Sequence, residues 1–372
     1  MSKQLSIVLP TTIALLERFQ TTLSAPAQDA PVSAELTEKD ALPLLSASST
    51  ALKSQVTKLS LLAITSPLTH SAVSTVLSAL NESVLPSLVT AALLITPANY
   101  TKAFHAEVQV LTKTALKEVS LLVAEVKSVA EKKDKAKDEG KKESELSQSE
   151  KDVVTVATGR VWESCDVLVD VAAKGVVGFV VRRVEEWRDL VRDAVEEIEE
   201  WDPDEDEDEF YDELLGDDGN KDAEAGSDNE EDDEESSAAL HAHKKSTMRI
   251  LKPVAQIYPA ILMNRLKNAG NKPLSSPSGV NKLESLMTNL QSIPENIDEV
   301  AGALYEDNLD KCTRYLKDVR SKATRSLNLV VLPWGSVEGN NSQEKAEDKF
   351  TTWSRTWMKV MDEVSKSVDE TK

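Results

Sequence analysis

The run from Asp202 to Glu235 is the feature that most limits how this chain can fold. It holds 20 acidic residues and a single basic residue, Lys221. Such a segment cannot bury enough apolar surface to offset the entropy of ordering the chain, and its like charges repel one another. We therefore expect a disordered acidic loop that interrupts the folded part of the 372-residue chain.

The rest of the chain reads as helical. Only 12 Gly and 14 Pro punctuate the sequence, whereas an all-β chain would need turn residues far more often. Apolar residues recur at intervals of three and four, as on one face of a helix. The sequence predicts an all-α fold, an elongated helical bundle in two halves interrupted by the acidic disordered loop.

The same periodicity predicts the domain organisation. We expect an N-terminal helical bundle, a charged linker, a pair of central helices, the acidic disordered loop and a C-terminal helical region that completes the bundle. The corresponding ranges are 1–130, 131–148, 149–201, 202–240 and 241–372.

Proline and leucine positions give more local expectations. Leu45, Leu52 and Leu59 stand one heptad apart, which suits a coiled-coil zipper or a bundle core, and the scarcity of flanking charges favours the core. Pro67 suits the first turn of one helix, and Pro294, with Ser292 as its cap, suits the first turn of another. Pro253 and Pro259 should kink or divide the helix that contains them.

The sequence offers no catalytic constellation, and we expect a protein that is not an enzyme and needs no cofactor. There is no phosphate-binding glycine loop, no nucleophile elbow and no helical pair of metal-ligating histidines. His241 and His243 border the acidic loop, where we read an exposed linker rather than a metal site. Cys165 and Cys312 are too few and too far apart for a disulfide framework, so we expect buried thiols.

Membrane and nucleic-acid roles also lack support. The stretch from Leu59 to Thr101 carries one charge, Glu82, but polar residues and prolines interrupt it, so buried bundle helices are the better interpretation. The amino-terminal residues lack the hydrophobic region of a signal peptide. Because no segment combines unopposed basic charge with aromatics, we expect no direct contact with nucleic acid.

Two groups of residues are candidate contacts for partner proteins. Within the acidic loop an apolar island suits a short binding motif, although it could equally be part of a loop that docks on its own bundle. In the last helix two tryptophans one turn apart suit either an interface anchor or the core. Ser227 precedes acidic residues and is a candidate phosphorylation site. The contact candidates are Phe210, Tyr211, Leu214, Leu215, Trp353 and Trp357.

Three stretches of sequence carry a family resemblance. They are Thr158-Gly-Arg-Val-Trp-Glu-Ser-Cys-Asp166, then Ala194-Val-Glu-Glu-Ile-Glu-Glu-Trp-Asp-Pro203 before the acidic run, and finally Ser292-Ile-Pro-Glu-Asn-Ile-Asp-Glu-Val-Ala-Gly-Ala-Leu-Tyr305. In this order they resemble the cyclin-D-interacting protein family, over about 150–203 and 245–322. The motif residues are Trp162, Cys165, Trp201, Pro203, Pro294, Asp298 and Tyr305.

The resemblance implies a helical protein of cytoplasm and nucleus that binds D-type cyclins and helix-loop-helix regulators and restrains cell-cycle progression. From it we expect a non-catalytic regulatory adaptor. Two other functions remain open, an acidic histone chaperone-like protein and a cytoskeletal helical bundle of the vinculin or talin kind. The sequence does not define the oligomeric state or the binding surface.

Overall fold

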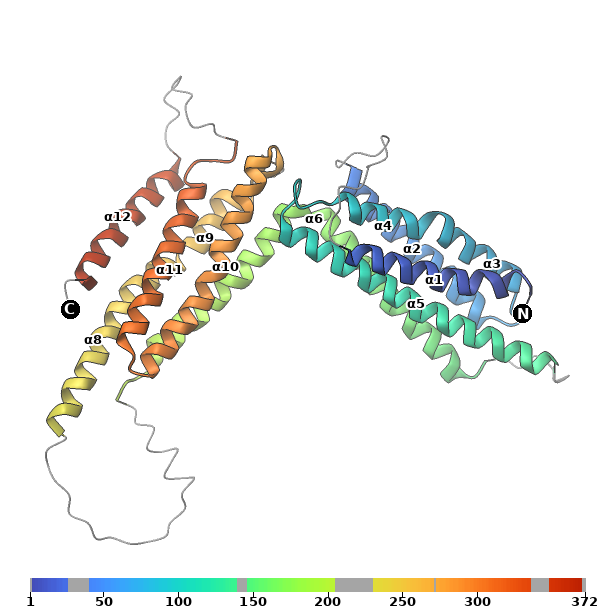
Figure 1. Ribbon diagram of the computed structural model, residues 1–372, viewed down its shortest axis with the longest axis horizontal. Coiled ribbons are helices and arrows are strands. Elements are labelled where there is room, and N and C mark those ends of the chain that lie inside the picture. Colours follow the sequence, from blue (N-terminus) through green and yellow to red (C-terminus); the bar gives the residue numbers. More distant parts are fainter. Residues whose placement is uncertain are drawn as a thin grey trace, which may run out of the picture. The chain divides into compact units, whose positions relative to one another are not determined.

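The computed structural model describes residues 2–25, 40–138, 146–204, 230–270, 272–335 and 348–369. Within these ranges the chain forms helices and turns and contains no strand, which confirms the all-α prediction. The chain divides into two compact units, Met1–Phe179 and Val180–Lys372 (Figure 1). Each unit has its own buried apolar core.

Unit 1 is a bundle of amphipathic helices. It comprises α1 (Leu5–Ser24), α2 (Ala41–Ile64), α3 (His70–Ala79), the π-helical turn η2 (Leu80–Val84), α4 (Leu85–Leu94), α5 (Lys102–Asp138) and the amino-terminal part of α6 (Gln148–Glu200). The three heptad leucines Leu45, Leu52 and Leu59 are fully buried in this core, as predicted, and α2 packs against α3, α4 and α5. Burial of a leucine contributes about 1.5–3 kcal/mol, so such positions dominate the stability of the bundle.

One part of unit 1 has the length and hydropathy of a membrane span. Among the described residues this is His70–Leu94, where helical backbone runs through α3, η2 and α4. The same elements pack against α1 and α2, and Leu77, Leu80 and Leu88 are fully buried. A buried core helix meets the same criteria as a membrane span, so this run gives no independent support for membrane insertion.

Helix α6 contains one non-helical residue. At Gly175 the backbone angles are φ 61° and ψ −168°, a region that glycine reaches easily and other residues do not. Gly159, in the same helix, is not in that region, and no atom within 4 Å would meet a Cβ there. The pair of central helices predicted in 149–201 is therefore one helical run with a single-residue break at Gly175.

Unit 2 contains the remainder of α6 and the C-terminal helices. These are α8 (Glu230–Ala255), α9 (Ile257–Ile261), the π-helical turn η3 (Leu262–Leu266), the short η4 (Lys272–Leu274), α10 (Pro277–Tyr305), α11 (Leu309–Val330) and α12 (Lys349–Asp369). Helices α10 and α11 pack along each other, and α8 contacts α10, α11 and α12. The division expected near Pro253 and Pro259 is present as the end of α8 and the short α9.

Two expected helix starts are wrong. Helix α3 begins at His70 rather than around Pro67, because Lys133 Nζ donates to Thr65 O (3.2 Å) and Ser66 Oγ (3.3 Å) and holds that segment as a turn. The start expected at Ser292 and Pro294 lies inside α10, which begins at Pro277.

The helix that contains Pro294 starts with a different cap. Ser276 has extended backbone, and its hydroxyl oxygen accepts a hydrogen bond from the Gly279 N–H at 3.1 Å. This is the N-cap geometry, and Pro277 occupies the first helical position. The helix then ends at Tyr305, and Asn308 caps α11 by accepting from the Lys311 N–H at 3.1 Å. The chain that follows Pro294 is thus divided between two helices, α10 and α11.

Helix α8 also differs from expectation, since it begins at Glu230, inside the range 202–240 predicted as a disordered loop. Ala238, Ala239 and Leu240 are strong helix formers, which explains helical backbone up to the predicted loop end. Residues 205–229 lie outside the described residues.

Candidate partner-binding site

The first group of motif residues lies in unit 1, where α6 packs beside α2. The Trp162 indole N–H donates to Thr57 Oγ1 at 3.0 Å, and Lys53 Nζ lies 5.8 Å from the centre of the indole ring. Lys53 is held in turn by Asp166, at 2.6 Å. Trp162 still exposes 38% of its surface. A large, fixed and partly exposed indole is the type of side chain that often dominates a protein interface.

Cys165 lies one turn from Trp162 but faces the interior. It is fully buried, and burial raises the pKa of its thiol to about 12. Cys312 of α11 is also buried, and burial raises the pKa of that thiol too. A thiol that stays protonated is a poor nucleophile and a poor metal ligand, so both cysteines are core residues. The Cys312 sulfur lies 3.7 Å from the Thr247 hydroxyl oxygen.

The second group of motif residues lies in unit 2, at the end of α6. The rings of Trp201 and Tyr305 meet edge to face, with centres 4.9 Å apart. The Tyr305 hydroxyl donates to Glu197 Oε1 at 3.2 Å. Partial burial and the negative charge of Glu197 raise the pKa of Tyr305 to about 12. The cluster therefore joins α6 to the last turn of α10.

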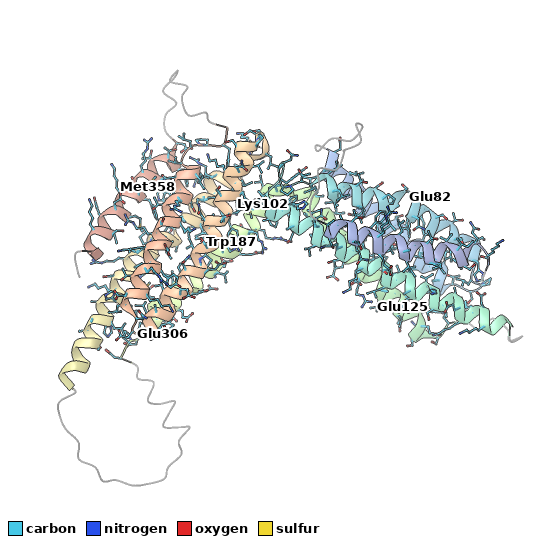
Figure 2. All side chains as sticks on the ribbon, viewed as in Figure 1. Glu82, Lys102, Glu125, Trp187, Glu306 and Met358 are labelled. Carbon is cyan, nitrogen blue, oxygen red and sulfur yellow. The ribbon has the colours of Figure 1, made fainter. Side chains whose placement is uncertain are left out.

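Negative charge gathers beside this aromatic pair. The pKa of Asp298 on α10 is raised, first by partial burial and then by the charges of Glu197, Glu295 and Glu299. Lys311 offsets part of this charge, because its Nζ lies 3.5 Å from Glu299 and 3.5 Å from Glu306 (Figure 2 labels Glu306). A shallow hollow adjoins the turn, lined by Ala239 and Glu306–Asp310.

Lysines from α8 hold the carboxyl end of α6. Lys244 Nζ donates to the backbone carbonyls of Glu199 and Trp201, and Lys252 Nζ lies 2.5 Å from Glu199 Oε1. A cation at this end satisfies carbonyls that lack helical partners and complements the helix dipole. Trp201 is thus fixed by α8 as well as by Tyr305.

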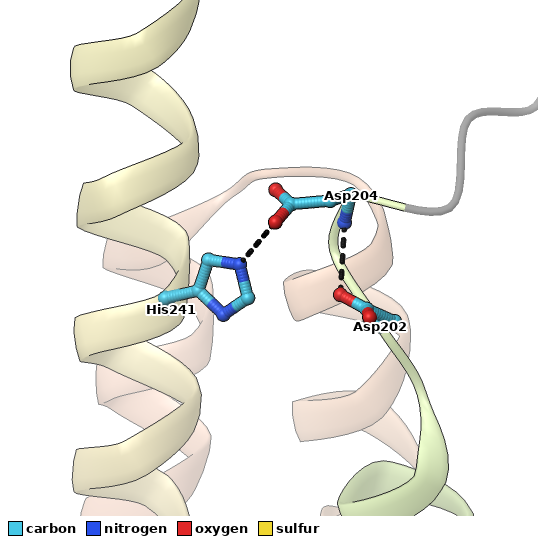
Figure 3. Close-up of side chains that lie close together, drawn as sticks. All are labelled: Asp202, Asp204 and His241. Carbon is cyan, nitrogen blue, oxygen red and sulfur yellow. Dashed lines mark hydrogen bonds and ion pairs between the residues drawn. The ribbon is translucent and has the colours of Figure 1, made fainter.

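The segment that follows Trp201 is also attached to α8. The Asp204 carboxylate accepts from Ser237 Oγ at 2.5 Å and lies 2.9 Å from His241 Nε2, and Asp202 Oδ1 accepts from the Asp204 N–H at 3.1 Å (Figure 3). The contacts from Ser237 and His241 lower the pKa of Asp204. Ligand atoms of Asp202, Asp204 and His241 lie within 4.8 Å of one another, but all three residues are exposed and Asp204 already has its partners. We assign no metal role to them.

The two C-terminal tryptophans do not form a common exposed surface. Trp357 is 6% exposed, and its indole N–H donates to Pro253 O at 2.9 Å. Trp353 is half-buried, with its ring centre 5.6 Å from that of Phe350. The structure therefore favours the core interpretation for Trp357. Spacing alone could not distinguish the two, because both indoles stand on the apolar side of α12.

The other predicted residues have varied positions. Pro294 is buried in α10, and Pro203 is half-buried just after Trp201. Phe210, Tyr211, Leu214, Leu215 and Ser227 lie outside the described residues. Sequence reasoning missed Thr57, Lys53 and Lys244, which fix the motif residues Trp162 and Trp201. Local sequence spacing could not identify these three residues, because each contacts a residue more than 40 positions away in the chain.

Comparison with known proteins supports the resemblance. Residues 44–204 match the family model described as "Grap2 and cyclin-D-interacting, N-terminal". The match begins in α2 and ends at Asp204, so it includes Trp162, Cys165, Trp201 and Pro203. The comparison with curated proteins gives no match. The match therefore confirms the family resemblance predicted over about 150–203 and extends it back to residue 44, whereas the predicted stretch 245–322 lies outside the matched residues.

Proposed function

We propose that this protein is a non-catalytic regulatory adaptor that binds D-type cyclins or helix-loop-helix proteins and thereby restrains cell-cycle progression in cytoplasm and nucleus. The observation that carries the proposal is the family match over residues 44–204, whose description names cyclin D interaction. The placement of the motif residues is consistent with a binding role.

The structure of unit 1 suggests where a partner would bind within the matched residues. Trp162 is a motif residue of unit 1 whose large side chain is 38% exposed and is fixed by Thr57 and by Lys53. Fixing a side chain before binding reduces the entropy lost in the complex. We therefore assign Trp162 as a principal contact for the partner.

The test is the affinity of the purified full-length chain for a purified D-type cyclin, measured by calorimetry. We expect Trp162→Ala to weaken binding by about tenfold or more, as for an interface residue that contributes at least about 1.4 kcal/mol. Met263→Ala is the matched control, because Met263 is a 59% exposed apolar residue outside the matched range. Far-ultraviolet circular dichroism would verify that both variants remain folded.

Other outcomes would assign a different function. Absence of binding to D-type cyclins and helix-loop-helix proteins would refute the adaptor proposal. Histone binding that is lost on deletion of Asp204–Glu235 would indicate a chaperone, because the acidic segment would then supply the affinity. Saturable co-sedimentation with actin filaments would indicate a cytoskeletal protein.

A further inference from the structure

Positive charge is concentrated in the part of unit 2 that follows the acidic run. Residues 237–283 contain eight Lys and Arg residues and no Asp or Glu. On α8 the residues Lys245, Arg249 and Lys252 are exposed. Their spacings of four and three residues place them on one side of the helix, and His241 continues the same line toward its amino end. We call Lys245, Arg249 and Lys252 the basic stripe.

Most cations of residues 237–283 have partners inside unit 2, but two residues of the basic stripe differ. Arg265 and Lys267 bind Asp348 and Glu185, Lys244 caps α6, and Lys252 contacts Glu199. Lys245 and Arg249 have no such partner among the described residues. The stripe therefore presents two uncompensated charges about 6 Å apart along the helix axis.

The acidic segment, residues 205–229, connects to the same helix at both ends. It carries 12 Asp and Glu residues against Lys221 alone. At its amino end Asp204 binds His241 of α8 (Figure 3), and it also binds Ser237 of the same helix. At its carboxyl end the chain enters α8 directly at Glu230.

The acidic segment 205–229 is long enough to reach the basic stripe. Twenty-five residues can span up to roughly 80 Å when extended. Lys245 and Arg249 lie only about 6 and 12 Å along α8 from His241, where Asp204 is bound. Tethering at both ends gives the segment an effective concentration on the order of millimolar, which an acidic partner in solution would have to exceed.

We propose that the basic stripe of α8 is the docking surface for the acidic segment 205–229 of the same chain. Bound there, the carboxylates neutralise Lys245 and Arg249 and withhold these cations from other polyanions. The contact is electrostatic and lies near the protein surface, so salt weakens it. The inference does not depend on the proposed function, because it concerns contacts within one chain.

The first test is zero-length cross-linking of the full-length chain with a carbodiimide, which joins lysine amines to carboxylates. At low salt we expect Lys245 to cross-link to residues 205–229 at least about fivefold more than Lys117, an exposed lysine of α5, and to lose this excess near 1 M salt. Arg249→Gln should reduce the Lys245 yield, whereas the control Arg325→Gln on the exposed side of α11 should not. Equal yields at Lys245 and Lys117 would refute the proposal.

Mixing isotopically light and heavy protein before cross-linking identifies the occupant. Products that join light to light and heavy to heavy alone support docking within one chain. Mixed products in statistical proportion would show that a second copy supplies the acidic segment, and this would overturn the proposal.

A second measurement uses binding to heparin as a probe of the exposed stripe. Replacing the acids of residues 205–229 by their amides should strengthen heparin binding several-fold, and adding Lys245→Gln and Arg249→Gln should remove the gain. If the gain survives these two changes, the cations uncovered are elsewhere and the assignment to α8 is wrong.

Discussion

At the scale of single residues, Pro294 and Tyr258 form a coupled pair in the core of unit 2. Proline has no N–H, so Pro294 leaves the carbonyl of Leu290, one turn earlier in α10, without its helical partner. The buried Tyr258 hydroxyl donates to that carbonyl at 2.7 Å. A proline inside a helix is thus tolerated because another helix supplies the missing donor.

This pairing predicts a non-additive effect on stability. Tyr258→Phe should lower the free energy of unfolding by about 1–3 kcal/mol, because it leaves a buried carbonyl unsatisfied. In a Pro294→Ala background residue 294 again has an N–H that can bond the Leu290 carbonyl. Tyr258→Phe should then lower the free energy of unfolding by clearly less. The measurement is urea unfolding of the four proteins in a double-mutant cycle.

Tyr315→Phe is the matched control for the loss of a hydroxyl, because Tyr315 of α11 is half-buried and its ring stacks on Arg314. It should change the free energy of unfolding by less than about 0.5 kcal/mol. If Tyr258→Phe lowered the free energy of unfolding equally in wild type and in Pro294→Ala, the coupling between Tyr258 and Pro294 would be contradicted.

A second residue pair predicts a pH dependence. Arg265 binds Asp348 through two contacts, at 2.8 and 3.0 Å, and lowers the pKa of Asp348 to about 2 from the ordinary 3.8. A depressed pKa in the folded state stabilises the fold above the unfolded pKa, and this contribution disappears as pH falls through the folded pKa. The stabilisation should therefore be full above about pH 4–5 and lost toward pH 2.

The corresponding experiment compares wild type with Asp348→Asn by urea unfolding across this pH range. We expect wild type to be more stable at about pH 5 and the difference to shrink steadily as the pH approaches 2. Asp362→Asn is the control, because Asp362 also binds an arginine, Arg320, but is 69% exposed in its side chain. A difference that does not change with pH would exclude the assigned linkage.

At the scale of the helices, two of the three glycines of α6, Gly175 and Gly159, have opposite requirements. Gly175 has a positive φ that a Cβ would strain, whereas Gly159 has ordinary helical backbone and open space beside it. Gly175→Ala should therefore destabilise the chain by roughly 1–3 kcal/mol. Gly159→Ala should stabilise it by about 0.5–1 kcal/mol. Urea unfolding followed by circular dichroism measures both, and the same sign for both would contradict this reading.

The observed helices show which sequence patterns were sufficient to predict secondary structure. Apolar periodicity predicted the helical bundle of residues 1–130 and its buried heptad leucines, because it depends only on neighbours within one helix. Helix starts were less predictable. Pro294 has the spacing of a first-turn proline after Ser292, and only the Tyr258 hydroxyl, contributed by α9, makes it acceptable inside α10. A local pattern contains no information about such a donor.

The candidate site shows the same limit. The motif residue Trp162 and the contact candidate Trp357 were both found from sequence, but exposure separated them, since Trp162 is partly exposed whereas Trp357 is buried against Pro253. Residues that fix Trp162 come from α2, far away in the chain. Sequence therefore supplied the candidate residues, and tertiary packing determined which of them are exposed.

At the scale of the whole molecule, each unit has a separate core, with Leu52 fully buried in unit 1 and Leu283 fully buried in unit 2. Replacing either leucine by alanine should lower the free energy of unfolding by about 2–5 kcal/mol, because a cavity remains in the core. We expect each substitution to lower protection from hydrogen exchange chiefly in its own unit, since cooperative opening follows contiguous packed contacts. Mass spectrometry of exchanging peptides from α2 and α10 measures this. If Leu283→Ala lowered protection in α2 as much as in α10, the two units would have to unfold as one, with α6 as the element that couples them.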